Sequence, residues 1–411
     1  SGRLGGPRGP RTGQEQKEET MSIFNYTNEE LESLKATFTA TEIHQQPSTW
    51  EKTIEQVRSR AEEIKAFINK VIHQEDYDVI LTGAGTSEFV GNALYSYLNR
   101  KLNYKVKSYA TTDLTATPEN YVSAHKPTLL ISYGRSGDSP ESIGAIQSVE
   151  AVNDNLYHLF ITCNKDGALS KRANTEGDRC LAINLTPETL DKSFAMTSSF
   201  TNMYLATVLC FNLDHFDETV AAVNDVIGAA KQLVEEDWPT IKEFDGAFDY
   251  GRIVYLGTNT LKGIAQESAL KMLELNAGKI VTMYDTPLGF RHGPKSIIDN
   301  TTLTVLYLSD GEYQRQYELD LLKEMSGQRK ENRIMVVCNT PCELAKSLAN
   351  YYYCFDTPAK DNVFVGLDFI IVAQLMALFA SIRNHFTPDN PCPTGEVNRV
   401  VKGVILYPYS K

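Results

Sequence analysis

Two stretches decide the fold, Tyr77–Leu94 (YDVILTGAGTSEFVGNAL) and Gly251–Leu270 (GRIVYLGTNTLKGIAQESAL). Each begins with a short apolar run rich in β-branched residues, passes through a turn and continues with a helical pattern. Their turn glycines, Gly83 and Gly257, are 174 positions apart (257 − 83). A buried strand followed by a glycine turn and a helix is the first half of a βαβ unit. The sequence therefore predicts this unit twice.

Two further pairs of segments keep nearly the same spacing. TLLISYG from Thr128 matches TLTVLYL from Thr302, again 174 positions apart (302 − 128). Cys163 in FITCNKDGAL matches Cys338 in MVVCNTPCEL at 175 positions (338 − 163). A repeat of long period indicates a duplicated domain. We predict an α/β fold of two tandem, doubly wound parallel sheets, each a three-layer flavodoxin-like α/β/α domain.

The segments around the repeat suggest how the chain is divided. A capping pattern from Thr27 (TNEE) and apolar residues at helical spacing predict helices before the first strand. The last segment holds too many prolines and glycines for a helix. We expect a disordered extension or expression remnant (1–20), an N-terminal helical arm (21–75), a first domain (76–215), a second domain (216–388) and an irregular tail over the active site (389–411).

Charge and cysteine content limit the possible partners and compartment. The formal net charge is −12 and the isoelectric point is about 5.2, which argues against nucleic acid and anionic membranes as partners. The seven cysteines are scattered and form no C-x-x-C pair, so we expect reduced thiols in a cytoplasmic protein. The first twenty residues contain no apolar segment typical of a signal peptide.

The most apolar stretch of the chain, residues 364–382 (FVGLDFIIVAQLMALFASI), is nearly long enough to cross a membrane. Asp368 and Gln374 interrupt it, and no basic flank precedes it. We therefore expect a buried core helix here and no membrane partner.

Two turns of the first repeat are rich in hydroxyl groups and glycine. The first contains Thr86 and Ser87, and the second runs Ser132-Tyr133-Gly134-Arg135-Ser136-Gly137-Asp138-Ser139. In open α/β sheets, ligands bind beyond the carboxyl ends of the strands, where helix N-termini favour anions. We predict a phosphate site at these turns. The first turn lacks the third glycine of a dinucleotide site, and neither turn is a P-loop. Arg135 is expected to pair with the phosphate or with a nearby carboxylate.

A possible proton-transfer group lies in the second repeat. Glu267, Lys271 and Glu274 share one face of a predicted helix, and without further information such a set is a solvated ion pair. The segment LGFRHGPKS then places His292 in a loop between a basic residue and Gly-Pro. A carboxylate and a histidine are the groups that general acid–base catalysis requires near neutral pH.

These residues resemble the sugar isomerase (SIS) domain family, from about Tyr77 to the C-terminus, with paired domains similar to the isomerase half of glucosamine-6-phosphate synthase. The family's sugar-phosphate turn S-G-[DE]-[ST] corresponds to Ser136–Ser139, and its G-T-S turn to Gly85–Ser87. One departure is Gly134, which stands where the synthase pattern S-x-S-G has its first serine. In the place of the family's A-S-T-K turn stand Met196, Thr197 and Ser198, so the lysine of that turn is lost. The resemblance implies that Thr197 and Ser198 help to bind the substrate.

The resemblance also implies roles for particular residues. It implies that Glu274 moves a proton between carbons 2 and 1, that Lys271 supports charge on the enediol oxygen, and that His292 opens the sugar ring. In the synthases this histidine comes from a neighbouring subunit, which implies a homodimer or larger assembly. Lys402, in NRVVKGV, corresponds to a lysine that forms a Schiff base with the open sugar, and is otherwise a surface lysine.

Within the family, ISYGRSGDSPES, YDTPLGFRHGPKS and FTPDNPCPTGEVNRVV resemble a subgroup of galactosamine-6-phosphate deaminase/isomerases, also called tagatose-6-phosphate ketose/aldose isomerases. The resemblance implies an enzyme acting on a phosphorylated amino sugar without a metal or other cofactor. The alternatives are a fructosamine-6-phosphate deglycase, a ketose/aldose-phosphate isomerase and a non-catalytic sugar-phosphate sensor.

Overall fold

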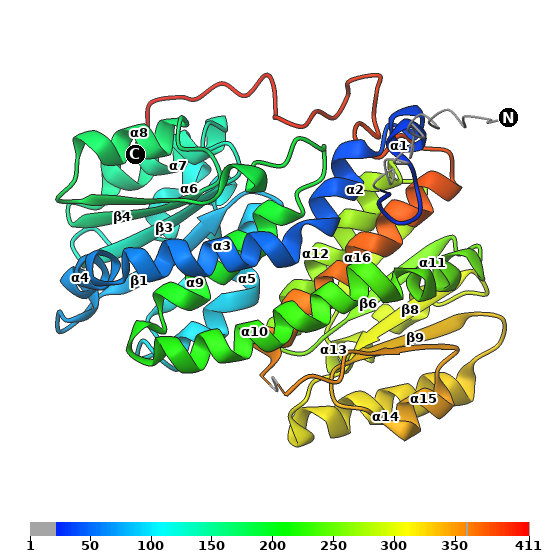
Figure 1. Cartoon of the computed structure of the whole chain (residues 1–411). Helices are drawn as coiled ribbons and strands as arrows, with labels where there is room; N and C mark the ends of the chain where they lie inside the picture. The colour runs from blue at the N-terminus through cyan, green and yellow to red at the C-terminus, as the bar shows by residue number, and fades with distance from the viewer. Residues whose placement is uncertain (1–21, 359–360, 411) are drawn as a thin grey trace, which may run out of the picture.

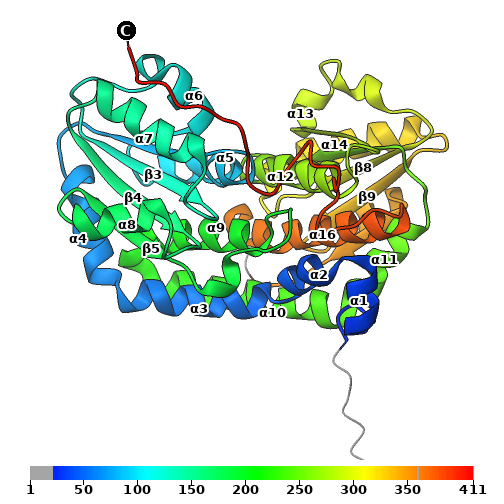
Figure 2. The same cartoon turned by 90° about the horizontal axis from the view of Figure 1, so that it is seen from above.

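The computed structural model describes residues 22–358 and 361–410. They form two five-stranded parallel sheets flanked by helices, with α5 (Thr86–Asn99) and α12 (Thr260–Leu275) packed together between the sheets (Figures 1 and 2). The expected extension at 1–20 lies outside the described residues.

The first sheet has the strand order β2-β1-β3-β4-β5, and all its strand pairs are parallel. Its strands are β1 (Asp78–Gly83), β2 (Val106–Ala110), β3 (Thr128–Gly134), β4 (Leu156–Thr162) and β5 (Cys180–Asn184). The helices that follow β1 to β5 in turn are α5, α6 (Thr111–Ala116), α7 (Pro140–Val152), α8 (Ala168–Thr175) and α9 (Ser198–Cys210).

The second sheet has the order β7-β6-β8-β9-β10, so both domains use the 2-1-3-4-5 order of flavodoxin-like folds. Its strands are β6 (Arg252–Leu256), β7 (Val281–Asp285), β8 (Thr302–Tyr307), β9 (Arg333–Cys338) and β10 (Tyr351–Cys354). Its helices are α12, α13 (Pro287–Phe290), α14 (Glu312–Gln328), α15 (Glu343–Leu348) and α16 (Asn362–Arg383). The predicted fold of two tandem doubly wound sheets is confirmed.

The strands are apolar on both faces because helices cover both faces. In β1, Val79 and Leu81 belong to the large core shared with α5 and α9, whereas Ile80 packs with the side chains of α6 and α7. In β6, Ile253 and Tyr255 belong to the same large core, and Val254 packs on the outer side, toward α14. Continuous apolar strands are expected in parallel sheets buried on both faces. The inner faces of the two sheets thus share one core.

Helices outside the repeat complete this core. The N-terminal segment forms α1 (Asn28–Leu34), α2 (Thr37–His44), α3 (Gln46–Ser59) and α4 (Ala61–Ile72), and α10 (Phe216–Gln232), a π-helical turn (Leu233–Asp237) and α11 (Trp238–Gly246) lead into the second sheet. Among the described residues, α16 alone is long and apolar enough to cross a membrane, and 94% of its most apolar window is buried in the protein. It packs against α10, α11 and α12.

The two domains meet at a close crossing of α5 and α12. A Cβ atom on Gly263 would lie 2.4 Å from the Cα of Ala93, so only glycine fits at this position. Beside it, Asn92 Nδ2 donates a hydrogen bond to Gln266 Oε1 at 3.0 Å. Because these two residues are also 174 positions apart (266 − 92), each occupies the equivalent place in its own domain.

We predict that Gly263→Ala lowers the free energy of unfolding by about 1–3 kcal/mol, because overpacking against Ala93 must separate the two helices. The matched control is Gly228→Ala in α10, where an added Cβ has no neighbour within 4 Å. This change should raise stability by ~0.5–1 kcal/mol, as alanine does inside an exposed helix. Urea unfolding followed by circular dichroism measures both. Equal effects of the two substitutions would contradict the packing argument.

Candidate active site

The first glycine turn connects β1 to α5. A Cβ on Gly83 would lie 2.5 Å from the backbone carbon of Ser87, and Gly85 has a φ of +56°, which favours glycine. The turn therefore brings Thr86 and Ser87 to the first positions of α5, and the positive end of a helix dipole attracts anions there.

The second glycine turn connects β3 to α7. Gly137 has a φ of +69°, and Ser136 Oγ accepts a hydrogen bond from the N–H of Asp138 at 3.2 Å. Ser139 caps α7 through Ser142, whose N–H and hydroxyl group both contact its side chain. Hydroxyl groups and a helix N-terminus thus face the same space as the first turn.

A cavity of about 230 Å³ lies between these turns and the C-terminal tail. Five of the predicted phosphate-site residues line it, namely Ser87, Gly134, Arg135, Ser136 and Ser139. The other lining residues are Ala84, Thr112, Tyr133, Gly137, Glu141, Ser142, Met196, Arg399, Val400 and Val401. The sequence alone did not indicate Thr112, Glu141 or Ser142 as part of a site.

Four predicted binding residues with hydroxyl groups do not line the cavity, namely Thr86, Ser132, Thr197 and Ser198. Ser132 is buried at the end of β3, and its Oγ has no hydrogen-bond partner among the described residues. Thr197 donates its N–H to Asp191 at 2.9 Å, and Ser198 donates its hydroxyl to the carbonyl of Glu42 at 2.5 Å. Thr197 and Ser198 therefore fix the segment between β5 and α9 in this structure.

The predicted proton-transfer helix is α12, and two of its three predicted charged side chains are shielded from solvent. Glu267 and Lys271 are fully buried, and the Lys271 ammonium contacts Glu267 Oε1 at 3.1 Å and Glu274. Lys271 also donates to Thr86 Oγ1 at 3.1 Å, and Thr86 donates to Glu267 Oε1 at 3.1 Å. The charged group of the second domain thus contacts Thr86, and the next residue, Ser87, lines the cavity. The alternative of a solvated ion pair is wrong.

Burial and charge set the protonation states of this group. Burial raises the pKa of Glu267 to about 7, although Lys271 opposes the shift. Burial disfavours the charge of Lys271, but the two carboxylates offset it and raise its pKa. Lys271 therefore stays an ammonium ion beside Glu274, whose side chain is 20% exposed and the most accessible of the three.

The structure does not bring His292 or Lys402 into the cavity of the same chain. His292 follows α13 on an exposed loop, where α13 packs against α14. Lys402 is exposed on the tail, one residue after Val401. The loop sequence and the resemblance both suggested His292, and the resemblance alone suggested Lys402. The described residues of one chain place neither of them beside Glu274.

The C-terminal tail crosses the first domain without forming a helix or strand (Figures 1 and 2). The carbonyl of Asp389 accepts a hydrogen bond from the N–H of Phe194 at 3.1 Å, near the start of the tail. Further on, Arg399 Nε donates to the carbonyl of Asp191 at 3.1 Å, and Tyr409 donates its hydroxyl to Glu119 at 2.8 Å. These contacts hold Val400 and Val401 against the cavity.

The tail is hydrogen-bonded to the segment Asp191–Thr197. Buried carboxyl groups hold this segment in place by accepting hydrogen bonds from its backbone. Glu42 accepts hydrogen bonds from the N–H groups of Lys192 at 2.6 Å and Ser193 at 3.0 Å. Burial, together with the nearby Asp191 carboxyl, raises the pKa of Glu42 to about 8. The pKa of Asp191 is also raised by burial.

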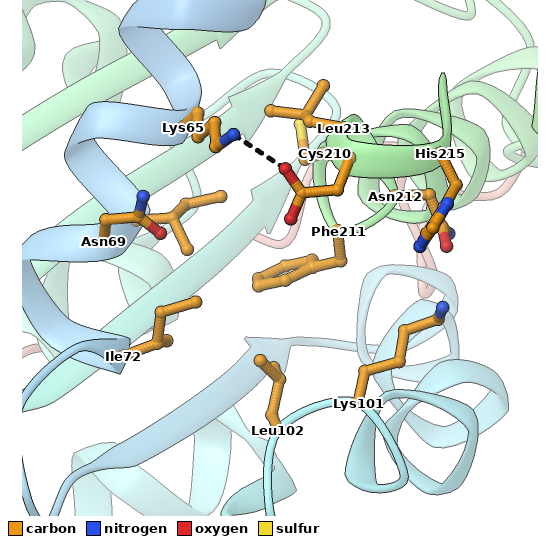
Figure 3. A pocket seen from close by; sticks show the side chains of 12 residues that line it. Lys65, Asn69, Ile72, Lys101, Leu102, Cys210, Phe211, Asn212, Leu213 and His215 are labelled. Atoms are coloured by element: carbon orange, nitrogen blue, oxygen red, sulfur yellow. Dashed lines mark hydrogen bonds and ion pairs between the residues drawn. The ribbon is translucent and has the colours of Figure 1, made fainter. Parts of the chain in front are cut away.

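Another hollow lies on the first domain, away from the glycine turns (Figure 3). It has about 300 Å³ and is lined by the C-terminal ends of α4, α5 and α9. These helix ends carry no free N–H groups toward the hollow, and Lys65 is already paired with Asp214 at 2.7 Å.

The described residues contain no group of three His, Cys, Asp or Glu side chains placed to hold a metal ion. All seven cysteines are free thiols, as predicted.

In a comparison with protein families, the SIS domain matches residues 72–213. The tandem doubly wound domains and the hydroxyl-lined cavity at a glycine turn agree with this match. Over 93% of its length the chain is 41% identical to the D-galactosamine-6-phosphate deaminase AgaS of Shewanella sp., and covers 95% of that relative. It is 38% identical to the Escherichia coli protein of the same name, over 91% of this chain and 96% of the relative. The chain belongs to the SIS-domain family and, within it, is similar to these AgaS proteins over nearly its whole length.

Two solved structures are also similar to the chain over nearly its whole length. A Clostridium novyi protein, provisionally named a tagatose-6-phosphate ketose/aldose isomerase, superposes with a TM-score of 0.92 at 40% identity, over 95% of this chain and all of that chain. The tagatose-6-phosphate ketose/aldose isomerase of Escherichia coli gives 0.83 at 34% identity, over 91% and 97% of the two chains.

We predict that Glu42→Gln removes a pH-dependent loss of stability. A carboxyl group whose folded pKa of about 8 exceeds its ordinary 4.5 binds more protons in the folded state, so its contribution to stability falls as pH rises between these values. From pH 5 to pH 9, the free energy of unfolding of the wild type should therefore fall by at least about 1 kcal/mol more than that of the variant. Urea unfolding across this range measures the difference.

The control for this prediction is Glu32→Gln, which removes an exposed carboxyl group from α1. Its stability profile should run parallel to that of the wild type. Parallel profiles for Glu42→Gln as well would show that Glu42 is ionised throughout the range.

Proposed function

We propose that the protein is a cytoplasmic amino-sugar-phosphate deaminase/isomerase, which converts galactosamine 6-phosphate to tagatose 6-phosphate and ammonia. The observation that carries this proposal is the Glu274–Lys271–Thr86 network, which ties a mostly buried carboxylate of one domain to the residue that precedes Ser87 of the cavity in the other. The names of the AgaS relatives support the same substrate. Retention of Glu274, His292 and Lys402 argues against a non-catalytic sensor.

In the proposed reaction the phosphate binds at Ser136 and Ser139, and His292 opens the ring to the aldehyde. Glu274 removes the proton from carbon 2 and returns it to carbon 1, which leaves an imine at carbon 2. Water adds to this imine, the carbon–nitrogen bond breaks, and ammonia and the ketose phosphate leave. Proton transfer by a positioned carboxylate contributes ~10²–10⁴-fold to the rate.

In this proposal the role of Lys271 is its ion pair with Glu274. Its side chain is fully buried and its ammonium group is engaged by Thr86, Glu267 and Glu274. A buried cation beside the base attracts the carboxylate and fixes its position. The implied role of charge support for the enediol oxygen would require Lys271 to exchange one of these partners for the substrate.

A panel of sugar phosphates tests the substrate. Galactosamine 6-phosphate and glucosamine 6-phosphate are incubated alongside neutral aldose 6-phosphates, and ammonia and ketose are both measured. We expect ammonia and ketose in equal amounts from the galacto amino sugar. Ketose from a neutral sugar without ammonia would instead identify a ketose/aldose isomerase, which is what the names of the two solved structures suggest. Release of an amino acid from a fructosamine 6-phosphate would identify a deglycase.

We predict that Glu274→Gln lowers turnover by ~10²–10⁴-fold, because the amide cannot accept the proton from carbon 2. The affinity for inorganic phosphate, measured by calorimetry, should stay within about threefold of wild type, since the cavity hydroxyl groups are unchanged. Wild-type turnover in this variant would show that another group is the base.

We propose further that the protein is a homodimer in which His292 serves the site of the partner subunit. Two features support this arrangement. His292 is exposed and lies outside the cavity, and Leu288, in α13 of the same segment, is exposed as well. A symmetric dimer would bury the same patch on both subunits and supply one histidine to each site.

We predict that two inactive variants complement each other. His292→Asn and Glu274→Gln subunits are co-expressed with different tags, and the hybrid is isolated by purification on both tags. One of its two sites then combines an intact Glu274 with an intact His292 from the other subunit, so turnover should be about half that of wild type. An inactive hybrid would place His292 and Glu274 of one chain in one site.

A further inference from the structure

Arg135 lies in the second glycine turn, but its guanidinium group does not point freely into the cavity. Nη1 donates to the carbonyls of Ser193 at 3.0 Å and Phe194 at 3.2 Å, and Nη2 donates to the carbonyl of Arg399 at 2.8 Å. The residue is only 9% exposed. Among the described residues, its hydrogen-bond partners are three backbone carbonyls, and no carboxylate is among them.

These three carbonyls belong to two different segments. Ser193 and Phe194 lie between β5 and α9, whereas Arg399 lies in the tail, 264 positions after Arg135. The planar fork of arginine holds several donors in fixed directions, which suits it to bridging separate acceptors. One side chain therefore links the phosphate turn to both segments.

The tail depends on such polar contacts because it buries little apolar surface. Val397 is 55% exposed, Val400 40% and Val401 53%. Besides Arg135, the side chain of Arg399 anchors this part of the tail, through Nε and Nη2 on the carbonyl of Asp191. Hydrogen bonds from charged donors are roughly twice as strong as neutral ones. Loss of Arg135 should thus loosen this part of the tail, which would then be held here by the Arg399 side chain.

We infer that Arg135 is a positioning residue that fastens the C-terminal tail over the cavity and improves sugar binding through the tail, without being a ligand of the phosphate. This inference rests on the proposed function, since it takes the cavity to be the sugar-phosphate site. Arg135 thus holds Val400 and Val401 where they close the cavity beside Ser136 and Ser139.

Limited trypsin digestion of the ligand-free protein tests the fastening. Trypsin must capture the Arg399 side chain, which is bound to Asp191, whereas Lys402 is already exposed and serves as an internal reference. In Arg135→Gln, the initial rate of cleavage after Arg399, relative to cleavage after Lys402, should rise about tenfold. The matched control is Arg100→Gln, which removes an exposed arginine at the end of α5 and should cleave like wild type.

Two binding measurements separate positioning from direct contact. For Arg135→Gln we expect a KM for the amino-sugar phosphate about tenfold higher, and a calorimetric Kd for inorganic phosphate within about threefold of wild type. A direct ligand predicts the opposite pattern, a Kd weakened more than tenfold with wild-type cleavage after Arg399. That pattern would overturn the inference.

Arg135→Lys keeps the positive charge but not the fork, and is the second variant if Arg135→Gln does not fold. We expect it to release Arg399 to trypsin as well, because a single ammonium group does not span both segments. If Arg135→Lys were cleaved after Arg399 at the wild-type rate, the positive charge alone would be enough to hold the tail. The inference would then be wrong. Cleavage and phosphate binding are measured without turnover, so they stand even if the enzyme acts on another substrate.

Discussion

The close crossing of α5 and α12 is the constraint on which the rest of the structure depends. Gly263 lets the backbones approach until a Cβ would be 2.4 Å from Ala93. At this separation Thr86, at the start of α5, reaches Lys271 on α12. A larger residue at the crossing would move the carboxylates of one domain away from the cavity of the other. The site is therefore a consequence of how the domains pack and belongs to neither alone.

The two domains share a topology but have different chemistry. The positions 174 before Glu267, Lys271 and Glu274 hold Ala93, Tyr97 and Arg100, so the first domain has no equivalent of the proton-transfer group. In the second domain, Glu318 fills the turn after β8, where it accepts hydrogen bonds from Ser309 N–H, Ser309 Oγ and Thr258 Oγ1, each at 2.7 Å. A carboxylate of the protein itself takes the place at which a second anion would bind.

The sequence predicted the fold well because its signals were local. Apolar strands, glycine turns and helical spacing recur in both halves, and each can be recognised within about twenty residues. The same holds for Ser136 and Ser139, which lie in the turn that their strand and helix define. Burial was harder to foresee, since Glu267 and Lys271 have the spacing of an exposed ion pair. Their burial comes from α5 and α16, which lie far away in the sequence.

Side chains whose partners are remote in the sequence were the hardest to place. Arg135 bonds to residues 58 and 264 positions away, and Ser198 to one 156 positions away. No local pattern reports such contacts, so the sequence did not indicate the three carbonyl groups that Arg135 binds. This difference matters for the tail. A segment held by a few charged hydrogen bonds, with its valines exposed, detaches by exchanging those bonds for water and leaves the shared core intact. The cavity can thus open to substrate without any change in the packing of α5 against α12.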